Sequence, residues 1–371
     1  MGSNNRADIE SVPWDFAMIE GLKMGSGKIR IGIIGGGWVA TARHIPSFLR
    51  DPRCAVVGLA DYNRERGLAT AQRFSIPNVV PSLAELLNVG VDAVSICTPP
   101  WTHAELSLQA LEAGVHVLTE KPMAVTVSDA RAMVQAAEAR GLKLSVVHNF
   151  LFSRSATRAA RLMARAPDEA PVHAAAVQLS SGRRRLPPWY PKLPGGLFFD
   201  EAPHMVYMLQ RFMGELELTY ATATRGSAKS GQPYRGIHVG FQSASGTASL
   251  LMVFDSPVSE WLIAAIRRLD LMVLDLFRDT FTLVGPDGRH KPFDVLKTSL
   301  GCVLQHIAEV TASGSRFIAG RLLYGHDVLI RGFIDSIVQG TPPPVTGHDG
   351  LAVVEMLWKI LDACGLNRRE M

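Results

Sequence analysis

The chain has 371 residues, of which 47% are hydrophobic and 19% are charged, and its formal net charge is +4. At roughly 100–200 residues per domain this length suggests two domains, and the composition excludes global disorder. The small charge, with no dense run of Lys and Arg among aromatic residues, argues against nucleic acid as a partner. No stretch of about 18 apolar residues occurs, so we expect no membrane span.

Four cysteines lie far apart and form no C-x-x-C pair: Cys54, Cys97, Cys302 and Cys364. This spacing argues against a disulfide framework or a thiolate metal site and predicts reduced thiols. Residues 1–27 carry acidic side chains and no continuous apolar signal core, which predicts a flexible lead-in and a cytoplasmic protein.

Short apolar strands alternate with helical stretches between residues 28 and 148. The expected strands are Ile29–Ile34, Ala55–Ala60, Asp92–Cys97, Val115–Leu118 and Leu142–Val147. The expected helices run up to about Arg50, over Asn63–Phe74, over Trp101–Ala113 and onward from a cap at Ser128. This alternation is typical of βαβ units, and near-continuous apolar strands fit a parallel sheet that is covered on both faces. We therefore predict a dinucleotide-binding Rossmann domain over residues 28–148.

After about Asn149 the pattern changes to longer strands with few helices between them. Strands are expected at His173–Leu179, Ile237–Phe241, Ala248–Phe254 and Leu271–Leu283, with a turn at Pro286-Asp287-Gly288. Strands joined by turns favour a large, mostly antiparallel open sheet. The last predicted helices, Asp327–Gly340 and Gly350–Cys364, are candidates to pack back on the Rossmann domain. The predicted fold class is α/β, with residues 149–371 as a second domain for substrate binding and oligomerisation.

A glycine-rich turn follows the first strand. The pattern G-x-G-x-x-[G/A] is matched by Gly35, Gly37 and Ala40, with Trp38 and Val39 between the last two. The turn opens a helix, and an acidic residue ends the next strand, as in a dinucleotide-binding fingerprint. Gly35 makes the tight turn, Gly37 leaves room for the pyrophosphate, and the helix N-terminus offers N–H donors to the phosphates.

The acidic residue at the end of the second strand is Asp61. A carboxylate there accepts hydrogen bonds from the adenosine ribose and repels the extra phosphate of NADP, so we expect NAD. Arg64 leaves NADP open as the alternative, because an arginine accommodates that phosphate. A plain helix cap is the structural alternative for Asp61.

Three further motifs occur in a characteristic order. They are Glu120-Lys121-Pro122 after the strand Val115–Leu118, Asp200-Glu201-Ala202-Pro203-His204 after Gly195-Gly196, and Thr346-Gly347-His348-Asp349-Gly350 before the last helix. With this order and spacing the chain resembles the Gfo/Idh/MocA family of sugar and cyclitol oxidoreductases over residues 28–365. The resemblance implies a C-terminal domain whose open sheet packs beside the Rossmann domain and often forms the oligomer interface. We therefore expect a homo-oligomer, either a dimer or a tetramer.

The resemblance also implies a catalytic set. Lys121 is expected beside the nicotinamide and the substrate, and His204 is expected to handle the proton with Asp200 as its acidic partner. Oxidation of a carbinol needs a proton acceptor, and an imidazole with a pKa near 6.5 suits that role. Lys121 would stabilise negative charge on the same oxygen and favour neutral His204. A structural histidine and a solvated lysine are the alternatives. Two ligands do not make a metal site, so no metal is expected.

Other residues are expected to line the cofactor and the substrate. The resemblance places along the cofactor Thr98, Pro99, His103 and Glu120, and it places Asn149 in the cleft. Arg183 begins the run Arg183-Arg184-Arg185, which is either a solvated loop or a contact for an anionic substrate group. Three residues depart from the family pattern: Ala202, Pro203 and Tyr207, the last of which stands where many members have a further aspartate.

The predicted function is that of an NAD(P)-dependent oxidoreductase that interconverts a secondary alcohol and a ketone on a sugar, cyclitol or sugar-derived metabolite. A non-catalytic dinucleotide-binding regulator is the alternative from another class, although the presence of both Lys121 and His204 argues against it. A third hypothesis is an enzyme that oxidises its substrate transiently with NAD to permit elimination or glycoside cleavage. Net cofactor turnover separates these hypotheses, whereas fold alone does not.

Overall fold

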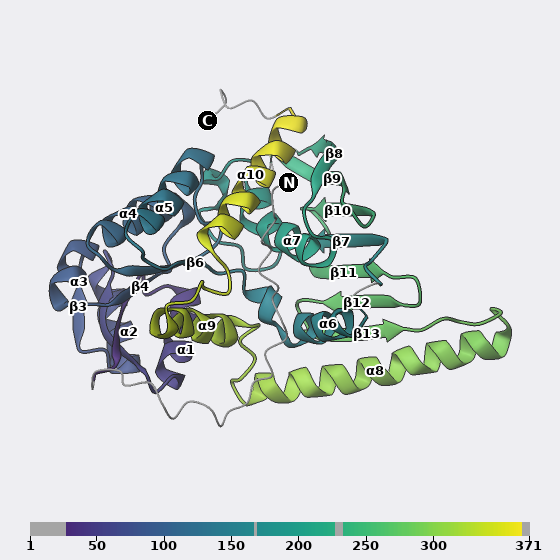
Figure 1. Ribbon diagram of the computed structural model, residues 1–371, viewed down its shortest axis with the longest axis horizontal. Coiled ribbons are helices and arrows are strands. Elements are labelled where there is room, and N and C mark those ends of the chain that lie inside the picture. The colour runs from purple at the N-terminus through teal and green to yellow at the C-terminus, as the bar shows by residue number, and fades with distance from the viewer. Residues whose placement is uncertain (1–26, 167–168, 227–232, 366–371) are drawn as a thin grey trace, which may run out of the picture.

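The computed structural model describes residues 27–166, 169–226 and 233–365. In this part of the chain a parallel sheet and a mostly antiparallel sheet form two halves of one molecule, on the left and right of Figure 1. The predicted lead-in, residues 1–27, lies outside the described residues except for its last residue. No helix within the described ranges is long and apolar enough to cross a bilayer.

The six-stranded sheet of the described N-terminal part has the order β3-β2-β1-β4-β5-β6, and all its neighbours pair in parallel. Its strands are β1 (Ile29–Ile34), β2 (Cys54–Ala60), β3 (Asn78–Val80), β4 (Ala93–Ile96), β5 (His116–Thr119) and β6 (Leu144–Val146). Its helices are α1 (Ile45–Arg50), α2 (Arg64–Phe74), α3 (Leu83–Val89), α4 (His103–Glu112) and α5 (Val127–Ala139), and a π-helical turn (Ala40–His44) precedes α1. The strand order reverses between β1 and β4, and ligands of such sheets bind beyond the carboxyl ends of the strands at this switch point.

The predicted Rossmann architecture is confirmed, with two local differences. The short elements β3 and α3 were not predicted, because a three-residue strand gives too little periodicity to recognise. Helix α5 is capped by Thr126 and not by Ser128, since the Thr126 side chain accepts the N–H of Asp129 at 3.1 Å.

The seven-stranded sheet of the described C-terminal part has the order β13-β12-β11-β7-β10-β9-β8. Its strands are β7 (His173–Leu179), β8 (Glu217–Arg225), β9 (Tyr234–Gln242), β10 (Thr247–Val253), β11 (Glu260–Ile266), β12 (Leu271–Asp275) and β13 (Thr280–Val284). Only the pair β10–β7 is parallel among these, so the prediction of a mostly antiparallel sheet is confirmed. Strands β8 and β11 were not predicted.

The predicted single strand Leu271–Leu283 is wrong. The segment forms a hairpin of β12 and β13, and Asp279 in its turn has a φ of 48°. Aspartate tolerates this left-handed conformation, but Leu276 and Phe277 continue the apolar pattern through the turn and conceal it in the sequence.

The helices of the second half are α6 (Arg154–Arg165), α7 (Leu197–Met213), α8 (Pro292–Ile318), α9 (His326–Gln339) and α10 (Gly347–Ala363). Helix α7 is buried along almost its whole length, between the sheet strands β7, β10 and β11 and helix α10. Helix α10 also packs on α5, and Trp358 donates a hydrogen bond to the Val125 carbonyl at 3.0 Å. The last helices thus lie against the Rossmann half, while α8 runs along the edge strand β13 (Figure 1).

Candidate active site

Lys121 and Asp200 meet at the boundary between the two halves of the molecule. Lys121 lies just after β5 and is joined to Pro122 by a cis peptide bond. Asp200 lies in the first turn of α7. The Lys121 ammonium donates to the Asp200 backbone carbonyl at 2.7 Å and to its carboxylate at 2.8 Å. Both side chains are largely buried, at 14% and 11% exposure. The structure therefore brings two predicted catalytic residues, 79 positions apart, into direct contact.

His204 lies one turn beyond Asp200 on α7, but the two side chains do not form the expected pair. Its Nδ1 is 2.7 Å from the hydroxyl of Tyr207, which also accepts the N–H of Phe150 at 3.3 Å. The His148 ring stacks on Tyr207 with centroids 4.4 Å apart. In this structure Asp200 is bound by Lys121 and Tyr207 holds the imidazole, and the role of Asp200 as acidic partner of His204 stays a prediction.

Burial sets the protonation of this histidine cluster. It lowers the pKa of His204 well below its usual range, and the nearby positive charge of Lys121 lowers it further. Burial also lowers the pKa of His148 to about 4 and raises that of Tyr207 well above its usual range. All three groups are thus uncharged near neutral pH, which leaves His204 able to accept a proton.

The glycine turn after β1 fits a dinucleotide. Gly35 has a φ of 90°, and a Cβ there would come within 3.0 Å of the Cys97 carbonyl oxygen and of the Thr98 methyl group. A Cβ on Gly37 would meet nothing within 4 Å, so open space lies beside the backbone where a pyrophosphate is expected to approach. Ala40 is fully buried, whereas Trp38 is 54% exposed.

Asp61 is buried at the end of β2 and bound by several donors. Its carboxylate accepts the N–H of Gly36 at 2.8 Å and that of Asn63 at 2.9 Å. Two nitrogens of Arg66 donate to it at 2.7 Å each. Burial alone would raise the pKa of Asp61, but these hydrogen bonds, with that from Arg66 foremost, lower it. The arginine in contact with the acid is therefore Arg66, whereas Arg64 is exposed at the start of α2.

His103 connects the two loops that the sequence places along the cofactor. The ring is fully buried, with Nδ1 2.8 Å from the Pro122 carbonyl oxygen and Nε2 2.8 Å from the Thr98 carbonyl oxygen. Pro99 follows Thr98 and is half-buried. His103 thus fixes the loop after β4 to the turn that carries Lys121.

Glu120 points away from solvent into a histidine pair. Its carboxylate lies 2.8 Å from Nε2 of His44 and 3.8 Å from Nε2 of His326. Burial would raise the pKa of Glu120, but the contacts with His326 and His44 lower it well below its usual range. Burial would lower the pKa of His44, but Cys97 and Glu120 raise it to about 10. Glu120 is therefore buried in a charge pair with His44, the last residue of the π-helical turn Ala40–His44.

The ligand atoms of His44, Glu120 and His326 lie within 4.8 Å of one another, as ligands of a metal ion would. Hydrogen bonds explain the arrangement without an ion. Nδ1 of His44 bonds to Ser95, Nε2 of His44 bonds directly to Glu120, and Nδ1 of His326 donates to the Leu323 carbonyl, each at 2.8 Å.

The arginine run after β7 places Arg184, and not Arg183, beside the site. Arg184 forms an ion pair with buried Glu201 on α7, and its guanidinium lies 5.9 Å from the Trp261 ring centre. Arg183 is exposed, and Arg185 stacks over Trp38 at 5.3 Å. Spacing alone could not separate these three arginines, because only the fold decides which of them faces α7.

Asn149 begins a short 3-10 helix after β6 and is buried. Its amide donates to the Tyr324 carbonyl at 3.0 Å, which ties this helix to the segment before α9. The neighbouring Phe150 packs edge-on against His204, with ring centres 5.0 Å apart. Asn149 therefore stands close to the histidine cluster, with its own amide engaged by the backbone.

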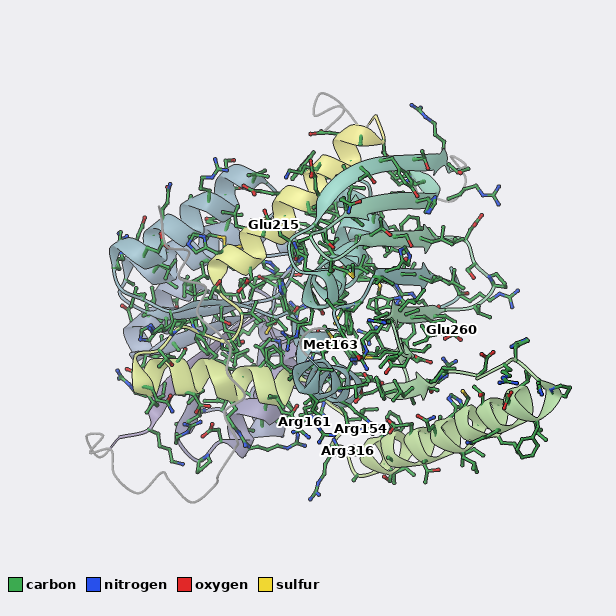
Figure 2. The ribbon with its side chains drawn as sticks, turned by 45° about the vertical axis from the view of Figure 1, so that its right-hand side comes forward. Arg154, Arg161, Met163, Glu215, Glu260 and Arg316 are labelled. Atoms are coloured by element: carbon green, nitrogen blue, oxygen red, sulfur yellow. The ribbon has the colours of Figure 1, made fainter. Side chains whose placement is uncertain are left out.

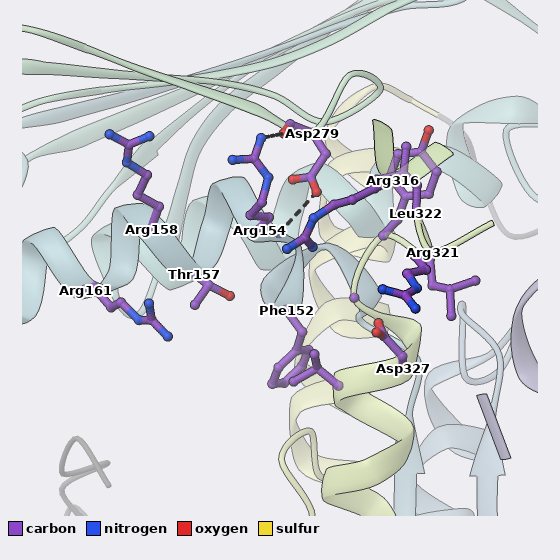
Figure 3. A pocket seen from close by; sticks show the side chains of 14 residues that line it. Phe152, Arg154, Thr157, Arg158, Arg161, Asp279, Arg316, Arg321, Leu322 and Asp327 are labelled. Atoms are coloured by element: carbon purple, nitrogen blue, oxygen red, sulfur yellow. Dashed lines mark hydrogen bonds between the residues drawn. The ribbon is translucent and has the colours of Figure 1, made fainter. Parts of the chain in front are cut away.

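A separate pocket of about 350 Å³ opens between α6, the end of α8 and the start of α9 (Figures 2 and 3). Its lining includes five arginines: Arg154, Arg158, Arg161, Arg316 and Arg321. Asp279 and Asp327 also line it, and Arg154 donates to the Asp279 carbonyl (Figure 3). None of the predicted site residues lines this pocket, so it is distinct from the site around Lys121 and His204.

Comparison with known proteins supports the sequence pattern. A family model described as "Oxidoreductase family, NAD-binding Rossmann fold" (GFO_IDH_MocA) matches residues 29–148. "Oxidoreductase P35" of Formosa agariphila is 27% identical over 55% of this chain and 65% of its own length. The 1,5-anhydro-D-fructose reductase of Ensifer adhaerens is 40% identical over 36% of this chain and 39% of its own length. The D-glucoside 3-dehydrogenase of Escherichia coli K12 is 37% identical over 33% of this chain and 35% of its own length.

The chain thus matches less than two thirds of the length of each of these relatives. Solved structures, in contrast, match about nine tenths of this chain. GenD2 from gentamicin A biosynthesis, solved with NAD, is 22% identical, with a TM-score of 0.73 over 91% of this chain and 95% of that chain. The WlbA dehydrogenase of Bordetella pertussis, solved with NADH and UDP-GlcNAcA, is 19% identical. Its TM-score is 0.75 over 92% of this chain and 97% of that chain. At these identities the likeness establishes the fold.

Proposed function

Because residues 29–148 belong to the Gfo/Idh/MocA oxidoreductase family and form its NAD-binding Rossmann fold, we propose that this chain is an NAD-dependent sugar dehydrogenase or reductase. It interconverts a secondary alcohol and a ketone on a sugar, cyclitol or sugar-derived metabolite by hydride transfer. The residues that we propose to carry the reaction are Lys121, Asp200 and His204.

One observation carries this proposal: a buried, neutral histidine stands one helical turn from a buried lysine–carboxylate pair. Lys121 lies beyond β5, on the carboxyl side of the parallel sheet, where cofactors of this fold bind. The open space beside Gly37 supports a bound pyrophosphate at the same edge. A regulator that only senses a dinucleotide has no need of both a neutral proton acceptor and a cation at this position.

In the direction of oxidation, neutral His204 accepts the proton of the substrate hydroxyl. We assign the tautomer in which Nδ1–H of His204 donates to the Tyr207 hydroxyl oxygen, so that the lone pair of Nε2 can take up the proton. The Lys121 ammonium stabilises the negative charge that develops on the same oxygen, and Asp200 keeps that ammonium in place. Bound NAD, held beside Lys121, would supply the acceptor for the hydride of the carbinol carbon. In reduction His204 returns the proton.

The cofactor that we propose is NAD. The Asp61 carboxylate ends β2, where an acid is expected to bind the adenosine ribose, and its bonds with Arg66 keep that guanidinium from a 2′-phosphate. NADH or NAD in solved relatives is consistent with this preference. The sugar class rests on relatives that act on 1,5-anhydro-D-fructose and D-glucosides. We propose that Arg184, in place of Arg183, contacts an anionic substituent on the substrate. We also expect the chain to form a homo-oligomer.

Cofactor reduction by the purified chain tests this proposal. Free sugars, inositols, sugar acids and sugar nucleotides would be offered with NAD and NADP in parallel, and Lys121→Ala would serve as the control. Turnover that the variant loses supports a dehydrogenase and identifies the substrate class. NAD binding without turnover on any compound, with sugar elimination products formed, supports transient oxidation. Binding with no chemistry at all supports the regulator and overturns the proposal.

A further inference from the structure

Helix α8 faces the rest of the molecule with polar side chains. Gln305 exchanges two hydrogen bonds with the backbone of Leu283 on the edge strand β13, at 3.0 and 3.1 Å. Glu309 is buried and forms ion pairs with Arg154 and Arg158 of α6. A surface helix ordinarily turns its apolar stripe towards the core. Helix α8 instead directs polar side chains inward, where Gln305 bonds the backbone of the edge strand at Leu283 and Glu309 pairs with the arginines of α6.

The outer side of α8 carries an exposed apolar stripe. Its members are Phe293, Leu296, Leu300, Val303, Ile307 and Val310, which we call the α8 stripe. Steps of three and four residues alternate along it, which is the spacing of the seam in a coiled coil. Exposure ranges from 41% at Val310 to 74% at Phe293, and Phe317 continues the pattern at 72%. Leu304, at 67%, widens the stripe.

We propose that the α8 stripe pairs with the α8 stripe of a second copy of this chain about a two-fold axis. The seam spacing fits a helix as the partner, and a two-fold contact uses the same surface on both copies. None of the six stripe residues is charged, so self-pairing buries no charged side chain of the stripe. This surface differs from the open sheet face that the family resemblance implies, and it is independent of the proposed reaction.

The size of the stripe is sufficient for a stable pair. Helix α8 has 27 residues, which corresponds to a length of about 40 Å. The six stripe side chains, together with Leu304 and Phe317, present on the order of 800 Å² to solvent, and a standard interface buries about 800 Å² per partner. In Figure 1 the first part of α8 extends past the ends of β12 and β13, where a second helix can reach it.

Analytical ultracentrifugation of the full chain at micromolar concentration tests the pairing. The double variant Leu300→Asp/Ile307→Asp places two carboxylates in the stripe, seven residues apart, at side chains that are 53% and 57% exposed. We expect it to halve the mass of the wild-type assembly. Ala308→Asp/Ser315→Asp is the matched control, with the same spacing on the same helix at exposed positions outside the stripe.

Far-ultraviolet circular dichroism and NAD binding check that each variant is folded. The conservative double variant Leu300→Met/Ile307→Leu is expected to keep the wild-type mass. A monomeric wild-type chain overturns the proposal, and so does an unchanged mass for the stripe variant. A control variant that dissociates equally would show that added charge, and not the stripe, breaks the assembly, and the proposal would then be wrong.

Discussion

Nδ1 of His204 lies 2.7 Å from the hydroxyl of Tyr207, three residues further along α7. A phenol therefore holds the imidazole that we propose as the proton acceptor, where the sequence predicted a carboxylate. A carboxylate partner would favour the charged imidazolium, but a neutral phenol does not. The contact with Tyr207 is thus consistent with a histidine whose pKa is lowered by burial and by Lys121.

Replacing Tyr207 by phenylalanine tests whether this hydroxyl orients the imidazole. Tyr207→Phe keeps the ring that stacks on His148 but removes the hydrogen bond to His204. We expect kcat to fall about tenfold, which corresponds to about 1.4 kcal/mol, with little change in NAD affinity. Steady-state kinetics and NAD titration measure the two effects. Tyr220→Phe, an exposed tyrosine on β8, is the control, and equal kcat values for both variants would contradict the role.

The pH dependence of activity follows from the lowered pKa of His204. The imidazole is already neutral below the ordinary histidine pKa of about 6.5, so kcat/KM for oxidation is expected to stay level between about pH 8 and 6. Lys121→Met removes the positive charge that contributes to this lowering, so the acid limb of its residual activity should move to higher pH. An acid limb at the same pH in both proteins would show that Lys121 does not influence His204.

The lysine–carboxylate pair makes a prediction about stability. Lys121→Met leaves the Asp200 carboxylate buried at 11% exposure without its cation, and breaking a buried pair costs about 3–5 kcal/mol. We expect a marked fall in Tm for this variant. Lys121→Met/Asp200→Asn removes the unpaired charge and should recover most of the loss. Thermal unfolding of both variants measures the difference, and an equal Tm would rule out charge burial as the cause.

The sequence predicted the parts of the fold that have local signals. The apolar run of β1, the glycine turn at Gly35 and the helix from Arg64 to Phe74 each depend on neighbouring residues. The contact between Lys121 and Asp200 joins residues 79 positions apart and was not predicted, because the family motifs placed both residues in the catalytic set but paired Asp200 with His204. Tyr207 was noticed only as a departure from the family, although residues 204 and 207 are neighbours on any helix.

Other features could not be predicted, because they depend on what each surface meets. Helix α8 contains Gly301 and Gly314, and its inner face is polar, so it lacks the usual pattern of a surface helix. The family resemblance predicts that Glu120 lines the cofactor. Its side chain instead pairs with His44, which lies on a separate element after the glycine turn. Selection of Arg66 over Arg64 as the partner of Asp61 depends on helix geometry that spacing alone does not resolve.

The bonds between Asp61 and Arg66 predict how the cofactor preference can be changed. Asp61→Ser removes the negative charge and frees the Arg66 guanidinium, which can then bind a 2′-phosphate. We expect the ratio of kcat/KM for NADP to that for NAD to rise by about 10–100-fold, since one charged contact contributes about 1.5–3 kcal/mol. Combining Asp61→Ser with Arg66→Ala should cancel the gain, whereas Arg64→Ala should leave it. Loss of the gain with Arg64→Ala would instead identify Arg64 as the phosphate ligand.

The buried pair of His44 and Glu120 predicts how stability changes at alkaline pH. The pKa of His44 is raised to about 10, so its charged form stabilises the fold fully below about pH 6.5, the unfolded value. This contribution is lost as the pH rises from about 6.5 through 10. Glu120→Gln keeps the shape of the side chain but removes the charge that faces Nε2 of His44 at 2.8 Å.

We therefore expect the Tm of Glu120→Gln to lie furthest below that of the wild type near pH 6.5. The two values should approach each other as the pH rises to 10, because the wild type then loses the same pair. Differential scanning calorimetry at several pH values measures this gap, and Glu138→Gln, an exposed acid on α5, provides the control. A gap that is constant from pH 6.5 to 10 would mean that His44 is neutral throughout and that a plain hydrogen bond joins it to Glu120.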